Sequence, residues 1–178
     1  MTSGLVAAAF RGLRRNRCTA ADLVPGFTAL QWMLRKEFIF SPDTACSGYV
    51  ARGLSELTEY GALQCVDATY ELTDISRISE IYSLFRSVLE AYWIVLVTIA
   101  KTPRTTSDII KTLHSSVDAL ISEGTISRPE AITDIHLKNA IRTFQEDGLL
   151  TLDAQGRLNV SQSDLEAVMS WLQPMVNA

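Results

Sequence analysis

The sequence predicts a mostly α-helical protein made of two winged-helix-like units that are joined by a long apolar helix. Apolar side chains recur at helical spacing along most of the 178 residues, and 47% of the residues are hydrophobic. A pattern of helix, glycine stop and alternating hairpin occurs twice, and a continuous apolar segment separates the two copies. We therefore expect a first unit over residues 1–73, the connecting helix over 74–102, and a second unit with a C-terminal helix over 103–178.

The first expected helix is amphipathic and basic. Ser3 can cap its start, and its apolar side carries Leu5, Val6, Ala9, Phe10 and Leu13. Arg11, Arg14 and Arg15 fall on the other side and form a candidate interaction surface. Residues 1–41 carry six Lys/Arg against two acids, whereas the net charge of the whole chain is -4. This asymmetry favours an acidic partner or an anionic membrane surface, and an ordinary solvated face is the alternative.

The second expected helix begins at a cap formed by Thr19 and Asp22. Proline has no backbone N–H to donate, so Pro25 and the adjacent Gly26 should confine the regular helix to the residues after them. The helix should end before Pro42.

The repeat becomes visible when the sequence is shifted by 87 residues. The helix 49–60 ends at Gly61, where a left-handed residue can close it, and the alternating segment LQCVDATYEL follows. The shift places Gly61 on Gly148, and the second copy ends in LLTLDAQGRLNV with a turn at residues 154–156. Upstream of this copy we expect a helix over 107–123 that Gly124 closes, and a short turn after Pro129.

Between the copies, a helix is expected from about Ile75 to Ala100. Its apolar run AYWIVLVTIA is shorter than the roughly 20 residues that span a bilayer, so a buried helix is expected, with no transmembrane helix or secretory signal. Glu90 precedes this run, and it lies either in a buried pair, for example with an arginine, or at the edge of the helix.

No catalytic, cofactor-binding or metal-binding residue is expected. The three cysteines form no C-x-x-C pair, and the phosphate-loop, nucleophile-elbow and zinc-protease motifs are all absent from the sequence. His114 and Asp118 are the nearest approach to an acid–base pair, and a surface pair at i, i+4 is a simpler interpretation than a catalytic dyad. His136 is expected in the first turn of its helix.

Winged-helix units raise the hypothesis of DNA binding, because the third helix of such units commonly lies in the major groove. The first copy offers Arg52 beside Glu56 and Glu59, and the second offers Lys138 and Arg142 beside further acids. The sequence pI is about 5.2 and neither helix has a sustained basic stripe. Nucleic acid is therefore not an expected partner, and both helices are interpreted as packing elements.

Four stretches, taken in order, resemble a known family: TSGLVAAAF, CTAADLVPGFTALQWMLRKEFIFS, RSVLEAYWIV, and LISEGTIS with HLKNAIRTFQEDGLL. They are similar to the region C-terminal to the catalytic domain in glycerol-3-phosphate and dihydroxyacetone-phosphate acyltransferases, and closest to the mitochondrial-type glycerol-3-phosphate acyltransferases. In that family an upstream domain with a His-x-x-x-x-Asp signature acylates a glycerol hydroxyl from acyl-CoA. This sequence has no such signature.

The resemblance implies a non-catalytic region that supports the upstream acyltransferase catalytic domain in the first step of glycerophospholipid and triacylglycerol synthesis. It implies membrane association at the mitochondrial outer membrane, with an anionic membrane surface as a further candidate partner of Arg11, Arg14 and Arg15. The competing hypothesis is a tandem winged-helix adaptor that binds protein or nucleic acid.

Overall fold

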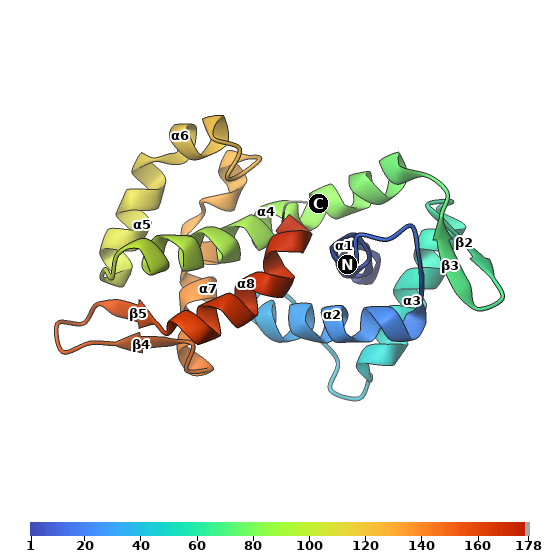
Figure 1. Cartoon of the computed structure of the whole chain (residues 1–178), viewed down its shortest axis with the longest axis horizontal. Helices are drawn as coiled ribbons and strands as arrows, with labels where there is room; N and C mark the ends of the chain where they lie inside the picture. The colour runs from blue at the N-terminus through green and yellow to red at the C-terminus, as the bar shows by residue number, and fades with distance from the viewer. Residues whose placement is uncertain (177–178) are drawn as a thin grey trace. The chain divides into compact units, whose positions relative to one another are not determined.

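A computed structural model describes residues 1–176, which form two compact units, 1–85 and 86–176 (Figure 1). Within these residues the chain has eight α-helices, one 3-10 turn and five short strands, so the prediction of a mostly α protein is confirmed. The helices are α1 (Thr2–Gly12), α2 (Ala20–Met33), α3 (Cys46–Glu59), α4 (Ile75–Lys101), α5 (Thr106–Ser115), α6 (Val117–Ser122), α7 (Asp134–Glu146) and α8 (Gln162–Val176). The boundary between the units lies within α4, so the expected connecting helix belongs partly to each unit.

The core of the first unit surrounds α1, which Figure 1 shows nearly end-on beside α2 and α3. Every residue from 4 to 10 is buried, so the helix is covered on all sides over these residues and not only on the expected apolar side. Small residues permit this close packing: a β-carbon on Gly4 would lie 1.8 Å from the ring of Phe85, and one on Gly53 would lie 2.5 Å from Val6. Ser3 does not cap α1, because the helix begins at Thr2, and its N–H donates instead to a carboxylate oxygen of α3.

The second helix begins as predicted and continues through its proline. Thr19 and Asp22 form a capping box at the start of α2. Pro25 lies inside the helix, so the expectation that regular helix starts only after it is wrong. Proline removes one backbone donor, but Leu23 and Phe27 on either side of it are fully buried, and this burial outweighs the missing hydrogen bond.

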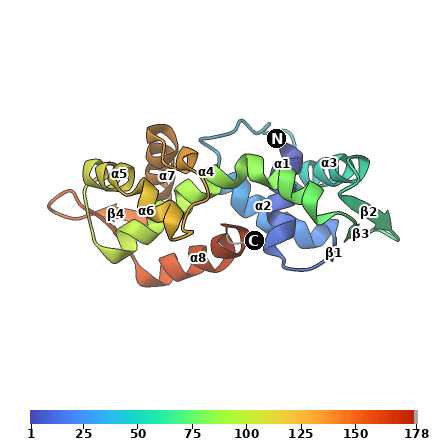
Figure 2. The same ribbon diagram turned by 90° about the horizontal axis from the view of Figure 1, so that it is seen from above.

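The first wing has the predicted helix, stop and hairpin. After α3, Gly61 has a φ of +78°, and β2 (Leu63–Val66) pairs antiparallel with β3 (Thr69–Leu72). A third strand, β1 (Arg17–Thr19), pairs with the other edge of β3 and lies beside it in Figure 2. This strand was not predicted, because three residues are too few to show an alternating pattern.

The second unit repeats the helix, stop and hairpin. Gly148 follows α7 with a φ of +74°, and β4 (Leu150–Leu152) pairs antiparallel with β5 (Leu158–Val160). Gly124 closes α6 with a φ of +69°, and the turn after Pro129 is a 3-10 turn, Pro129–Ala131. The single helix expected over 107–123 is two helices, since the chain bends at Ser116, whose hydroxyl bonds back to the carbonyl of Thr112.

The long helix α4 has 27 residues and contains an 18-residue window with a mean hydropathy of 1.5. By length and composition it could cross a membrane, although the apolar run 91–100 alone is too short. Core helices of soluble proteins meet the same criterion, and 56% of this window is buried.

Glu90 of α4 is fully buried in the second unit. Its carboxylate accepts from Nε of Arg86 at 2.8 Å, and from the N–H and hydroxyl of Ser127 at 2.9 and 3.1 Å. Glu90 was expected either in a buried pair or at the edge of the helix, and the structure shows the buried pair. The carboxylate also ties the loop before the 3-10 turn to α4.

Candidate functional site

The predicted arginine cluster, Arg11, Arg14 and Arg15, lies at the end of α1 and in the residues just after it. Arg11 is half-buried: its Nη1 donates to Oγ of Ser79 at 2.5 Å, and its guanidinium lies 4.9 Å from the ring centroid of Tyr82. Arg14 and Arg15 are exposed. Because both follow the last helical residue, the three arginines do not form the expected stripe along one face of the helix.

Arg14 occupies an unusual backbone conformation. It closes α1 with a φ of 53°, and the same closing position is held by Gly61 after α3, Gly124 after α6 and Gly148 after α7. Glycine adopts this left-handed conformation freely, whereas a residue with a β-carbon costs on the order of 1 kcal/mol there. An arginine therefore stands where backbone energetics favour a glycine.

A pocket of about 200 Å³ opens at this end of α1, and all three predicted arginines line it. The remaining lining residues are Phe10, Asn16, Leu72, Ile75 and Ile78. We call this the arginine pocket. Guanidinium groups hold phosphate or carboxylate oxygens through paired hydrogen bonds, and the aliphatic and aromatic wall suits a carbon skeleton. The pocket therefore has the chemistry to bind a small anionic amphiphile.

The acidic residue beside this cluster is Asp22, which lines a neighbouring hollow with Arg15 and Arg17. Its Oδ2 accepts from both the N–H and the hydroxyl of Thr19 at 2.7 Å. The hydrogen bond from the Thr19 backbone lowers the pKa of Asp22 most, and the charge of Arg15 lowers it further. In the described part of the chain, Arg14, Arg15 and Arg17 form no ion pair, so the carboxylate of Asp22 serves the helix cap and does not pair with them.

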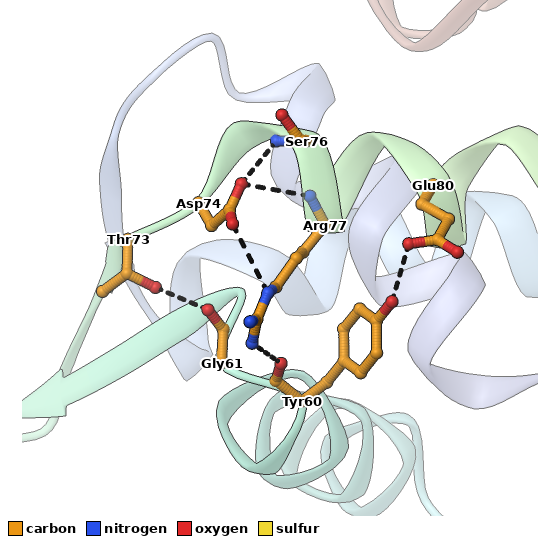
Figure 3. Close-up of polar contacts among 7 residues, drawn as sticks. All are labelled: Tyr60, Gly61, Thr73, Asp74, Ser76, Arg77 and Glu80. Atoms are coloured by element: carbon orange, nitrogen blue, oxygen red, sulfur yellow. Dashed lines mark hydrogen bonds and ion pairs between the residues drawn. The ribbon is translucent and has the colours of Figure 1, made fainter.

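The first turn of α4, which supplies Ile75 and Ile78 to the pocket, is fastened to the end of α3 (Figure 3). Asp74 accepts from the backbone N–H of Ser76 at 2.8 Å, and its other oxygen lies 3.4 Å from Nε of Arg77. Nη1 of Arg77 then donates to the carbonyl of Tyr60.

Further contacts complete this fastening. The hydroxyl of Thr73 donates to the carbonyl of Gly61 at 3.0 Å, and the hydroxyl of Tyr60 donates to Glu80 at 2.6 Å (Figure 3). The hydrogen bond to Glu80 is the largest cause of the raised pKa of Tyr60. We refer to Tyr60, Gly61, Thr73, Asp74, Ser76, Arg77 and Glu80 as the α4 clasp. The clasp holds one wall of the arginine pocket in place.

The expected pairing of His114 with Asp118 is wrong. His114 lies in the last turn of α5 and Asp118 in the first turn of α6, and the bend between these helices removes their i, i+4 relation. The ring of His114 instead contacts Asp134 through Nε2 at 2.8 Å, and Asp134 also binds Lys138 at 2.7 Å. The hydrogen bond from Lys138 is the largest cause of the lowered pKa of Asp134. Both partners of the His114 contact are exposed, which is typical of a surface pair.

Two cations of the wing helices are paired with acids. Arg52 on α3 pairs with Glu56 at 3.0 Å, and Lys138 on α7 pairs with Asp134. His136 lies in the first turn of α7, as predicted, and its N–H donates to the hydroxyl of Thr133. Cations paired with acids on the same helix are poorly suited to bind phosphates, whereas Arg142 on α7 is exposed and forms no ion pair among the described residues.

The cysteines and acids do not assemble a metal site within residues 1–176. Cys18 in the edge strand β1 is buried, and this burial raises the pKa of its thiol to about 11. The thiol is therefore protonated at neutral pH and is a poor nucleophile. Cys46 donates to Gln31, and Cys65 is exposed.

Sequence reasoning identified the arginines but missed the other lining residues. Leu72 and Asn16 meet because β1 pairs with β3, where the N–H of Leu72 donates to the carbonyl of Asn16 at 2.7 Å. Ile75 and Ile78 lie in the first turn of α4, interspersed with residues of the clasp. The sequence feature that could have identified these two lining residues is their position soon after the cap residue Asp74. Ile75 is 57% exposed.

A comparison with protein families found one match, described as the glycerol-3-phosphate acyltransferase C-terminal region, over residues 1–153. The matched range includes the arginine pocket, the α4 clasp and most of the second unit. A search of curated proteins found no match to the chain.

Proposed function

The chain belongs to the family of glycerol-3-phosphate acyltransferase C-terminal regions, and on this premise we propose that it is a non-catalytic region that supports an upstream catalytic domain. That domain would acylate glycerol 3-phosphate from acyl-CoA, the first step of glycerophospholipid and triacylglycerol synthesis. The family match over residues 1–153 is the observation that carries this proposal.

The non-catalytic role is supported by the surroundings of the histidines. General-base catalysis needs a base held within hydrogen-bond reach of the reacting hydroxyl. His114 lies on an exposed surface against Asp134, His136 lies in a helix cap, and the sequence has no His-x-x-x-x-Asp. The purified chain should therefore transfer no acyl group from acyl-CoA to glycerol 3-phosphate. Turnover that disappears in His114→Ala would contradict this role.

We further propose that the chain works at a membrane, as the outer mitochondrial location of the mitochondrial-type family members suggests. Arg14 and Arg15 are exposed and outside any ion pair in the described structure, so they are free to meet an acidic face of the catalytic domain or anionic headgroups. Near an anionic bilayer each such cation contributes about 1 kcal/mol. Salt screens this attraction over about 8 Å at physiological ionic strength, so vesicle binding should weaken as salt rises.

A triple variant tests this surface: Arg11, Arg14 and Arg15 are each replaced by glutamine. We would measure its sedimentation with anionic vesicles and its association with a separately expressed catalytic domain. The expected result is a loss in at least one assay, and Arg52→Gln, which removes one ion-paired cation, serves as the control. If the triple variant behaves as the parent chain in both assays, the arginines form only a solvated face.

A further inference from the structure

We propose that the arginine pocket binds the phosphate monoester of a glycerol phosphate, with Arg14 and Arg15 on the phosphate and the carbon skeleton on the apolar wall. The choice of glycerol phosphates rests on the proposed function, whereas the pocket itself requires a phosphate monoester joined to a small carbon skeleton. Four features support this assignment. They are the contacts of the lining residues, the size of the pocket, the backbone of Arg14 and the comparison with the second unit.

The three guanidinium groups differ in how they are held. Arg11 is fixed by Ser79 and by the ring of Tyr82, so its charge stays at the pocket without further ordering. Arg14 and Arg15 are exposed, line the pocket and form no ion pair within the described residues. A doubly charged phosphate monoester has enough oxygens to accept from both, and each charge-assisted bond is stronger than a neutral one.

The apolar wall and the volume of the arginine pocket limit which ligands it can hold. Phe10 and Ile78 are buried, and Leu72 and Ile75 complete an apolar surface that free phosphate would leave uncovered. At about 200 Å³ the pocket is smaller than the roughly 300–1,000 Å³ of sites for drug-sized ligands. It therefore suits a phosphate on a short polyol, and an attached acyl chain would leave over the exposed edge at Ile75.

The backbone of Arg14 provides an independent observation. Three other helices end on glycine at this position, but α1 ends on an arginine at a φ of 53°. Strained residues cost stability and cluster at functional sites. A residue retained only for folding would not need the guanidinium, because glycine would close α1 without strain.

The second unit has a pocket at the corresponding place, and its lining includes Val97, Thr98, Lys101 and Thr102. Shifted by 87 residues, Arg14 and Arg15 fall on Lys101 and Thr102, and the apolar Leu72 and Ile75 fall on Asn159 and Gln162. The pocket of the second unit therefore keeps a cation at Lys101 but has Thr98 and Thr102 in place of Arg11 and Arg15. We therefore assign the phosphate monoester to the pocket of the first unit, which has the three arginines.

The test is isothermal titration of the full chain with glycerol 3-phosphate, 1-hexanoylglycerol 3-phosphate and inorganic phosphate. We expect saturable binding that is tightest for the acylated compound and weakest for inorganic phosphate. Arg14→Gly and Arg15→Gln should each weaken glycerol 3-phosphate binding about tenfold. Arg17→Gln removes the same charge from a residue that does not line the pocket, and it should change affinity less than twofold.

Arg14→Gly separates binding from folding, because glycine relieves the left-handed backbone and should leave the melting temperature unchanged or higher. Full affinity in this variant, equal losses in Arg14→Gly and Arg17→Gln, or no saturable binding to the parent chain would each overturn the proposal.

A vesicle arm distinguishes a soluble ligand from a lipid headgroup. Phosphatidylcholine vesicles with phosphatidic acid carry phosphate monoesters, whereas those with phosphatidylserine carry the same sign of charge without one. Binding to phosphatidic acid that glycerol 3-phosphate displaces supports the pocket; equal, undisplaced binding to both vesicles overturns it. If the pocket fails this test while the chain still associates with the catalytic domain, the inference falls and the proposed function stands.

Discussion

The two units hold the long helix α4 by different kinds of contact, which are exposed in the first unit and buried in the second. In the first unit the fastening is the α4 clasp, whose Arg77–Asp74 pair is 50% and 42% exposed. In the second unit it is Glu90, which is fully buried and bound to Arg86 and Ser127. An exposed pair contributes little and adjusts easily, whereas a buried carboxylate is costly to disturb. The first unit thus has the more adjustable attachment, and it is the unit that contains the arginine pocket.

The glycine stops show the same contrast at one position. Gly61 and Gly148 have nearly equal φ values, +78° and +74°. A β-carbon on Gly61 would lie 2.3 Å from Nη1 of Arg77, while one on Gly148 would meet nothing within 4 Å. Shifted by 87 residues, Arg77 falls on Asp164, which takes part in the cap at Ser161. The repeat therefore fixes the backbone of each stop but not the side chains around it.

The largest effect should come from Glu90→Ala. It would leave Arg86 and the N–H of Ser127 without their acceptor in a buried site, and should lower the free energy of unfolding by roughly 3 kcal/mol. Glu80→Ala on the exposed part of the same helix is the control and should cost less than about 1 kcal/mol. Urea denaturation measures both, and equal costs would remove the contrast between the fastenings.

A smaller effect is expected at the stops. Gly148→Val should cost roughly 1 to 2 kcal/mol from the left-handed backbone alone. Gly61→Val should cost more than Gly148→Val, because the side chain of Arg77 must also move away. Thermal unfolding of both variants gives the comparison. Unchanged stability in both would mean that neither glycine closes its helix in the left-handed conformation.

The contribution of Arg77 itself can be isolated with a double-mutant cycle. In an Arg77→Ala background, Gly61→Ala should cost no more than Gly148→Ala does in the parent chain. The coupling between the Gly61 and Arg77 substitutions should be about 1 kcal/mol. Additive costs would show that Arg77 does not restrict the residue at position 61.

The smallest effect concerns pH and the second wing. The carboxylate of Asp153 accepts from the N–H groups of Gln155 and Arg157 and pairs with the Arg157 guanidinium at 2.7 Å. The backbone bond from Arg157 is the largest cause lowering the pKa of Asp153 below 3.8. The stabilisation is therefore present above pH 3.8 and is lost as the pH falls through the lower folded pKa.

Amide exchange at Gln155 and Arg157 would measure this loss, with Asp153→Asn as the reference. Below pH 3.8 the parent chain should approach the exchange rates of the variant. Rates that differ by the same factor at every pH would show that the charge of Asp153 does not stabilise the turn.

The sequence was most informative where the structure depends on local backbone. The capping box at Thr19, the stops at Gly61 and Gly148, and both hairpins were predicted, because each follows from residue types within a few positions. Pro25 and the burial of α1 were misjudged, since tertiary packing of the neighbouring helices decides both.

The candidate site shows the same limit. Arg11, Arg14 and Arg15 could be found from their clustering, but the apolar wall depends on β1 pairing with β3, a contact between distant segments. His114 could be found as well, but not its partner Asp134, because the bend at Ser116 has no clear sequence pattern.

The proposed role is tested most directly by the initial rate of glycerol 3-phosphate acylation by a separately expressed catalytic domain of the family, measured with and without this chain. We predict no acyl transfer by the chain alone, and a higher rate when the chain is added to the catalytic domain. A rate that the chain leaves unchanged, or acyl transfer by the chain alone, would contradict a non-catalytic supporting role.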